Sequence, residues 1–159
     1  MGAGQVKVIG CGNLFFGDDG FGPAVISFLT ENSPARSGIE LIDAGTAAGG
    51  ILLDVFFDEA ILKAIIIIDA MDLGLSPGVV KEIPMESIPS IKRDDFSVHQ
   101  FPSLDILSEL KRKGTKVRIV GCQAEVIPDQ VCPGLSDAVA AAVPQAALLI
   151  NNILDDLNI

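Results

Sequence analysis

The sequence contains a single histidine and few basic residues: 11 lysines and arginines stand against 21 aspartates and glutamates, for a formal net charge of −10 over 159 residues. With one histidine, this chain cannot by itself form a catalytic site that needs two imidazoles. The negative charge disfavours nucleic acid and anionic membranes as partners, because both are polyanions. It suits a cation or a basic segment of another protein.

Cysteines and long hydrophobic runs are also scarce. The three cysteines, Cys11, Cys122 and Cys132, form no C-x-x-C pair, so we expect a reduced, cytoplasmic protein without a disulfide framework. Hydrophobic residues make up 49% of the chain, but runs such as residues 64–68 stop far short of the roughly 20 residues of a membrane span. No membrane insertion is therefore expected. Short, unbroken apolar runs are typical of parallel strands buried on both faces.

Predicted strands and helices alternate along the chain. Apolar stretches predict strands at residues 5–9, 38–43, 64–70, 79–83 (an edge strand) and 116–121. Helical spacing predicts helices at residues 21–31, 49–59, 104–112 and 137–157, the last with Ser136 as its N-cap and a kink at Pro144. Residues 84–98 have mixed polarity and two prolines, which indicates an irregular loop. The order predicts one domain over residues 1–159. Its expected fold is an α/β three-layer sandwich, phosphorylase- or hydrolase-like, in which a mostly parallel twisted sheet of about five strands has helices on both faces.

Carboxylates follow successive predicted strands. Asp18 and Asp19 come after the first strand, Asp43 ends the second and Asp69 ends the third; Asp72 lies three residues further on, and His99 precedes a helix. Carboxyl ends of parallel strands meet at one edge of a sheet. Acids gathered there raise one another's pKa unless a cation compensates. An imidazole with two carboxylates is a ligand set for zinc or nickel that leaves positions open for water or substrate, which points to hydrolysis.

Each candidate also has a structural interpretation. Asp19 could complement a helix dipole, Asp43 could hold the loop at Gly45 and Thr46, and a lone histidine is commonly structural. The cysteines are most simply small buried hydrophobes.

Three other functions compete with hydrolysis. Gly10-x-Gly12 after a strand, with Asp43 for a ribose hydroxyl, resembles a dinucleotide-binding turn. However, Phe15 occupies the place of the third glycine, and Asp18 and Asp19 would repel a pyrophosphate. Cys11 or Cys122 beside His99 could act as a nucleophile, although no electropositive setting for either is evident. A module that binds a metal on another protein without catalysis remains open. No Gly-Lys-Ser/Thr of a Walker loop is present.

Four motifs in order resemble the nickel-iron hydrogenase maturation endopeptidases, which trim the C-terminus of the hydrogenase large subunit. They are Gly10-Cys11-Gly12-Asn13 followed by Asp18-Asp19-Gly20-Phe21-Gly22, then Asp43-Ala44-Gly45-Thr46, Ile68-Asp69-Ala70 and Ser97-Val98-His99-Gln100. The similarity covers essentially the whole chain and is closest to members that serve archaeal deazaflavin-reducing hydrogenases. Two departures matter. Many members have Glu at the position of Asp19, and Ala44 replaces a glycine whose backbone could need a positive φ.

The resemblance implies the site and its partner. Asp19, Asp69 and His99 correspond to the metal-contacting residues, with Asp43 as an auxiliary catalytic candidate. The metal is nickel delivered by the substrate, the large-subunit precursor, and zinc or cadmium are expected to occupy the site in vitro. The nickel would position the scissile bond, and a polarised carbonyl or an activated water would then lead to hydrolysis. A monomer is expected.

Overall fold

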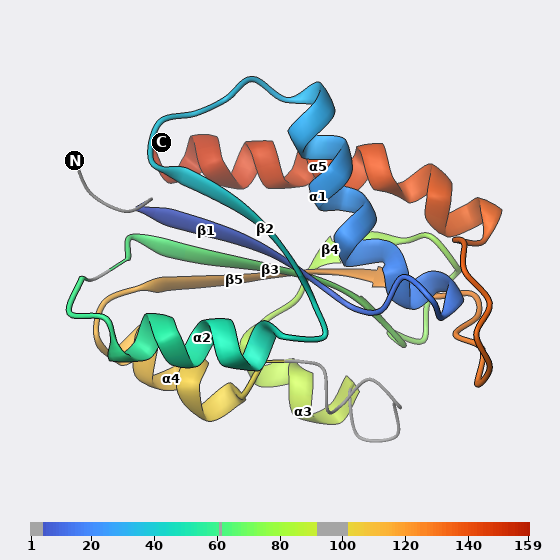
Figure 1. Cartoon of the computed structure of the whole chain (residues 1–159), viewed down its shortest axis with the longest axis horizontal. Helices are drawn as coiled ribbons and strands as arrows, with labels where there is room; N and C mark the ends of the chain where they lie inside the picture. Colours follow the sequence, from blue (N-terminus) through green and yellow to red (C-terminus); the bar gives the residue numbers. More distant parts are fainter. Residues whose placement is uncertain (1–4, 61, 92–101) are drawn as a thin grey trace.

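A five-stranded sheet forms the centre of the computed structural model, which describes residues 5–60, 62–91 and 102–159 (Figure 1). The strands are β1 (Val6–Cys11), β2 (Ile39–Gly45), β3 (Ala64–Met71), β4 (Val80–Glu82) and β5 (Lys116–Gln123). Their order in the sheet is β2-β1-β3-β5-β4. All neighbours are parallel except β4, which pairs antiparallel with β5 at the edge. The predicted α/β fold with a mostly parallel sheet is confirmed.

Helices cover both faces of the sheet. Helices α1 (Phe21–Asn32) and α5 (Asp137–Asp156) lie on one face, and α2 (Ala48–Phe57), α3 (Ile88–Ile91) and α4 (Leu104–Arg112) lie on the other (Figure 1). Strand β3 is buried along its whole length. Its even-numbered isoleucines join the cluster under α1 and α5, and its odd-numbered ones join the cluster under α2 and α4. Burying each such side chain stabilises the fold by about 1.5–3 kcal/mol, which explains the unbroken apolar run.

Part of one loop prediction is wrong. Residues 85–91 form the short 3₁₀ helix η2 (Met85–Ser87) and α3 instead of an irregular loop. Both prolines fit, because Pro84 precedes η2 and Pro89 lies in the first turn of α3, where a missing N–H breaks no helical hydrogen bond. The rest of the predicted loop, residues 92–98, lies outside the described residues.

The terminal helix α5 is long and apolar enough to cross a membrane by length and composition alone. Eight of its residues are buried, packed against the sheet and α1. A core helix passes the same test, so this property is weak evidence for insertion. The helix continues on both sides of Pro144, and the kink expected there stays a prediction.

The chain changes direction at β1. Helix α1 leads to β2 on one side of β1, and α2 then leads to β3 on the other side. Such a reversal is the topological switch point at which open α/β sheets bind ligands, beyond the carboxyl ends of the strands. Here it lies at the ends of β1 and β3.

Candidate active site

The segment after β1 is held by close backbone contacts at three glycines. A Cβ on Gly22, in the first turn of α1, would lie 2.3 Å from the carbonyl oxygen of Cys11, and a Cβ on Gly10 would lie 2.5 Å from that of Gly22. A Cβ on Gly12, which has a φ of 126°, would lie 1.8 Å from the carbonyl oxygen of Asp19. These glycines bring the start of α1 and the 3₁₀ helix η1 (Gly17–Gly20) against the end of β1.

Asp19 lies in η1 and is almost fully buried, with 3% of its surface exposed. Its Oδ2 accepts a hydrogen bond from the backbone N–H of Asn13 at 2.8 Å. The side chain is therefore fixed beside the end of β1, at the switch point.

Asp69 lies near the end of β3 and is 1% exposed. It pairs with Gly121 of β5, and strand alternation directs it to the same face as Ile65 and Ile67, towards α2 and α4. Burying a carboxylate costs several kcal/mol unless something compensates for it. Two buried acids at one switch point give this edge of the sheet a negative charge that suits a cation.

The predicted set of three ligands is seen only in part. His99 lies outside the described residues, so its place beside Asp19 and Asp69 stays a prediction. Among residues 5–60, 62–91 and 102–159, no three histidine, cysteine or acidic side chains form a group suited to a metal ion. The chemistry of two carboxylates with an imidazole still fits a divalent metal such as nickel.

Asp18 has a different environment from its neighbour Asp19. Its carboxylate accepts hydrogen bonds from the backbone N–H groups of Glu125 (2.8 Å), Val126 (2.9 Å) and Ser136 (2.7 Å). The hydroxyl of Ser136 donates a fourth at 3.0 Å, and the Ser136 side chain makes no capping hydrogen bond to α5. Asp18 therefore ties η1 to the segment between β5 and α5.

Asp43 lies at the same edge of the sheet but on the outer strand β2, where it is exposed. Its Oδ1 accepts a hydrogen bond from the N–H of Gly45 at 3.0 Å, an Asx turn that shapes the loop. The residue in this loop with a positive φ is Gly45 (50°), and Ala44 has none. Alanine at position 44 therefore costs the loop no strain.

Gln123 is a positioning residue that the sequence prediction missed. Its Oε1 accepts hydrogen bonds from the N–H groups of Leu73 (2.6 Å) and Leu75 (3.2 Å), and its Nε2 donates to Asp72 Oδ1 at 3.3 Å. Gln123 thereby shapes the loop that follows Asp69. The sequence feature that points to Gln123 is its position as a polar residue at the end of an apolar strand.

The cysteines differ in burial. Burial, and after it the charge of Asp18, raises the pKa of the Cys122 thiol to about 12, so Cys122 stays protonated near neutral pH and is no nucleophile. Cys11 is buried at the end of β1, and Cys132 is exposed. This disfavours the cysteine–histidine alternative for Cys122.

The dinucleotide alternative is disfavoured by the packing of Gly12. The space that a side chain at Gly12 would occupy is taken by the backbone of Asp19. In a dinucleotide fingerprint, the corresponding glycine leaves this space to the pyrophosphate, so that the backbone can approach it closely.

Comparisons with known proteins all point to the same family. The model of a family described as hydrogenase maturation protease matches residues 23–153, which include Asp69 and His99 and begin after Asp19. A protein of Methanocaldococcus jannaschii, provisionally named a hydrogenase maturation protease, is 44% identical over 92% of this chain and 94% of its own length. The coenzyme F420 hydrogenase subunit delta of Methanothermobacter thermautotrophicus is 33% identical over 98% of this chain and 96% of its own.

Solved structures agree with the sequence relatives. The hydrogenase maturating endopeptidase HybD from E. coli superposes with a TM-score of 0.76 at 26% identity and covers 95% of this chain and 92% of its own. Because the family match spans most of the chain and these relatives span nearly all of it, this protein belongs to the hydrogenase maturation protease family, whose members are hydrolases.

Proposed function

We propose that this chain is an endopeptidase that removes the C-terminal extension of a nickel-iron hydrogenase large-subunit precursor after nickel insertion. It recognises the nickel that the precursor carries. Family membership supports the reaction class. The observation that carries the proposal is the burial of Asp19 and Asp69 at the ends of β1 and β3, the two strands that flank the switch point.

The charge of these acids suits a metal that arrives with the substrate. Each carboxylate is almost fully buried, and an ion pair or a cation lowers the cost of keeping it ionised. Nickel bound in the precursor would gain ligands from Asp19, Asp69 and His99 when the precursor docks. A precursor without nickel gains no such contact and is not processed.

The chain's own residues then hold the scissile bond near the metal. The carboxylates would orient the metal-bearing end of the substrate, and nickel held there would supply Lewis-acid chemistry for polarising the scissile carbonyl or activating a water. We further propose that the enzyme acts in the cytoplasm as a monomer, and that zinc or cadmium can occupy the site in vitro. The substrate is the large subunit of a coenzyme F420-linked hydrogenase, in keeping with one relative's name.

Processing is tested with nickel-loaded and nickel-free precursor, read by the loss of mass from its C-terminus. Asp69→Asn, Asp19→Asn and His99→Ala should each lower the rate of cleavage at least about 100-fold. Asp54→Asn is the matched control, because Asp54 is an exposed carboxylate on α2, outside the candidate site; its rate should stay within about threefold.

The unfolding temperature separates a lost site from a lost fold. Asp69→Asn and Asp19→Asn should unfold within about 4 °C of the wild type, a shift that corresponds to about 1 kcal/mol. Full processing by Asp69→Asn and Asp19→Asn would contradict the proposed site. The non-catalytic alternative makes a different prediction, namely binding of the precursor without any change in its mass.

A further inference from the structure

Four large apolar side chains are exposed beside the candidate site. Leu14, Phe15, Val126 and Val131 are 53%, 59%, 53% and 69% exposed; we refer to them as the apolar platform. They come from two segments that are distant in sequence, the loop between β1 and η1 and the segment between β5 and α5. Single exposed apolar residues are ordinary, but a group of them marks an interaction site.

Backbone hydrogen bonds join the two segments of the platform. The N–H of Cys132 donates to Phe15 O at 2.8 Å, and the N–H of Gly17 donates to Cys132 O at 2.9 Å. The carboxylate of Asp18 also accepts hydrogen bonds from the backbone N–H groups of Glu125 and Val126. The platform is therefore built before any partner arrives, which lowers the entropy cost of docking.

The charges around the platform have one sign. Glu125, Asp129 and Asp137 are exposed acids, and none of them pairs with a basic group in the described part of the chain. Within the described part of the chain, the loops at this edge of the sheet, residues 12–20, 44–47, 72–79 and 124–136, contain no lysine or arginine. Most described basic residues lie near the opposite edge, at Lys7, Arg36, Lys63, Lys111, Arg112, Lys113 and Lys116.

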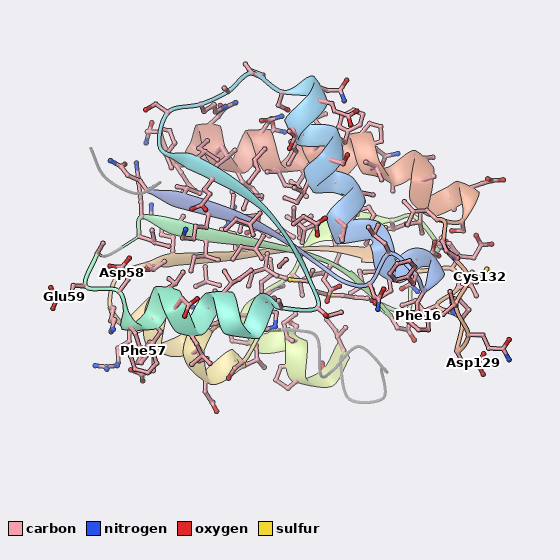
Figure 2. All side chains as sticks on the ribbon, in the orientation of Figure 1. Phe16, Phe57, Asp58, Glu59, Asp129 and Cys132 are labelled. Carbon is pink, nitrogen blue, oxygen red and sulfur yellow. The ribbon has the colours of Figure 1, made fainter. Side chains whose placement is uncertain are left out.

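Figure 2 shows the two ends of the molecule. Phe16, Asp129 and Cys132 lie together at one end, and Phe57, Asp58 and Glu59 lie at the other. The first end also holds η1, which carries Asp19, and Asn13, the donor to Asp19, directly precedes Leu14. A partner on the platform would thus lie next to the candidate site.

We propose that the apolar platform and the acids around it bind a segment of the large-subunit precursor that presents apolar side chains flanked by lysine or arginine. This inference rests on the proposed function and adds a second contact region to it. The apolar contacts supply affinity, and the acids steer the basic segment to the site. Binding here places the C-terminal extension of the precursor at Asp19 and Asp69.

The apolar contribution is tested with initial rates of processing of nickel-loaded precursor. Phe15→Ser and Val131→Ser should each raise KM about 10-fold with little change in kcat, because each removes an anchor but no group at the reacting bond. Phe57→Ser is the matched control, since Phe57 is exposed at the other end, and its KM should stay within about twofold.

The acidic contribution is tested by its dependence on salt. Asp129→Lys should raise KM at low ionic strength, and the difference from wild type should shrink at high salt because screening removes it. Glu59→Lys, at the opposite end (Figure 2), should leave KM unchanged.

Two results would overturn this inference while leaving the proposed function intact. One is wild-type processing with an unchanged KM in Phe15→Ser, Val131→Ser and Asp129→Lys. The other is a wild-type dimer in sedimentation that Phe15→Ser dissociates, which would make the platform a contact between copies of this chain and contradict the proposed monomer, but not the processing reaction. Failure of the wild type to shorten nickel-loaded precursor would instead contradict the proposed function.

Discussion

Asp18 and Asp19 are adjacent and both buried, but they serve two different regions of the molecule. Asp18 faces the segment before α5 and accepts four hydrogen bonds there, three of them from backbone N–H groups. Asp19 lies beside Gly12 and Asn13 at the end of β1, at the switch point, and Asp69 lies near the end of the neighbouring strand β3. Burial alone therefore does not identify a functional acid. A carboxylate surrounded by backbone donors is part of the framework, whereas one at a switch point is a candidate for chemistry.

The largest expected effect on stability comes from Asp18→Ala. It leaves the N–H groups of Glu125, Val126 and Ser136 without their acceptor, and each unsatisfied donor costs about 1–3 kcal/mol. We expect a loss of about 3 kcal/mol in the free energy of unfolding, measured by denaturant titration as a lower midpoint with an unchanged slope. Asp19→Asn should show the reverse pattern, a stable fold without processing. If the free energy of unfolding of Asp18→Ala equals that of the wild type, the structural role assigned to Asp18, and with it the contrast with Asp19, would be wrong.

Gly22→Ala should cost about 2–3 kcal/mol, because the new Cβ would lie 2.3 Å from the carbonyl oxygen of Cys11 and force α1 away from β1. Thermal unfolding measures the loss. Gly50→Ala in α2 is the control, since a Cβ there meets nothing within 4 Å and a helical alanine stabilises by about 0.5–1 kcal/mol over glycine. Equal changes in unfolding temperature at Gly22 and Gly50 would show that the close approach of Gly22 to Cys11 does not determine the position of η1.

The pH dependence of stability probes the burial of the Cys122 thiol. A thiol whose pKa rises on folding from 9.0 to about 12 stabilises the fold fully below pH 9 and loses that contribution as the pH rises to about 12. The free energy of unfolding should be roughly 1 kcal/mol lower at pH 10 than at pH 8. Cys122→Ala should remove this component of the pH dependence. An identical profile in Cys122→Ala and wild type would indicate that the thiol is not shielded.

The smallest effect is expected for Asp43→Ala. Losing the hydrogen bond from the N–H of Gly45 should cost about 0.5–1 kcal/mol, and processing should change less than about threefold. Chemical denaturation and the mass-based cleavage assay measure the two quantities. A loss of processing as large as that of Asp69→Asn would instead support the predicted catalytic role of Asp43.

The sequence predicted the sheet and the edge where the acids gather, because apolar runs such as 64–70 locate strand ends and parallel strands align those ends. It could not separate the roles of Asp18 and Asp19, since the partners of Asp18 are 107 to 118 residues away along the chain. The helix at residues 88–91 escapes prediction from the sequence because proline is a common loop signal, although Pro89 fits a first helical turn. The contact of Gly22 with the backbone of Cys11 depends on tertiary packing, which no local pattern encodes.

The hydrogen bonds from Ser136 to Asp18 also couple two parts of the molecule that are far apart in sequence. Asp18 precedes Asp19 in the 3₁₀ helix η1, and Ser136 lies at the start of the last helix, α5. A shift of this helix along the sheet would therefore reach Asp19 through a single neighbouring residue.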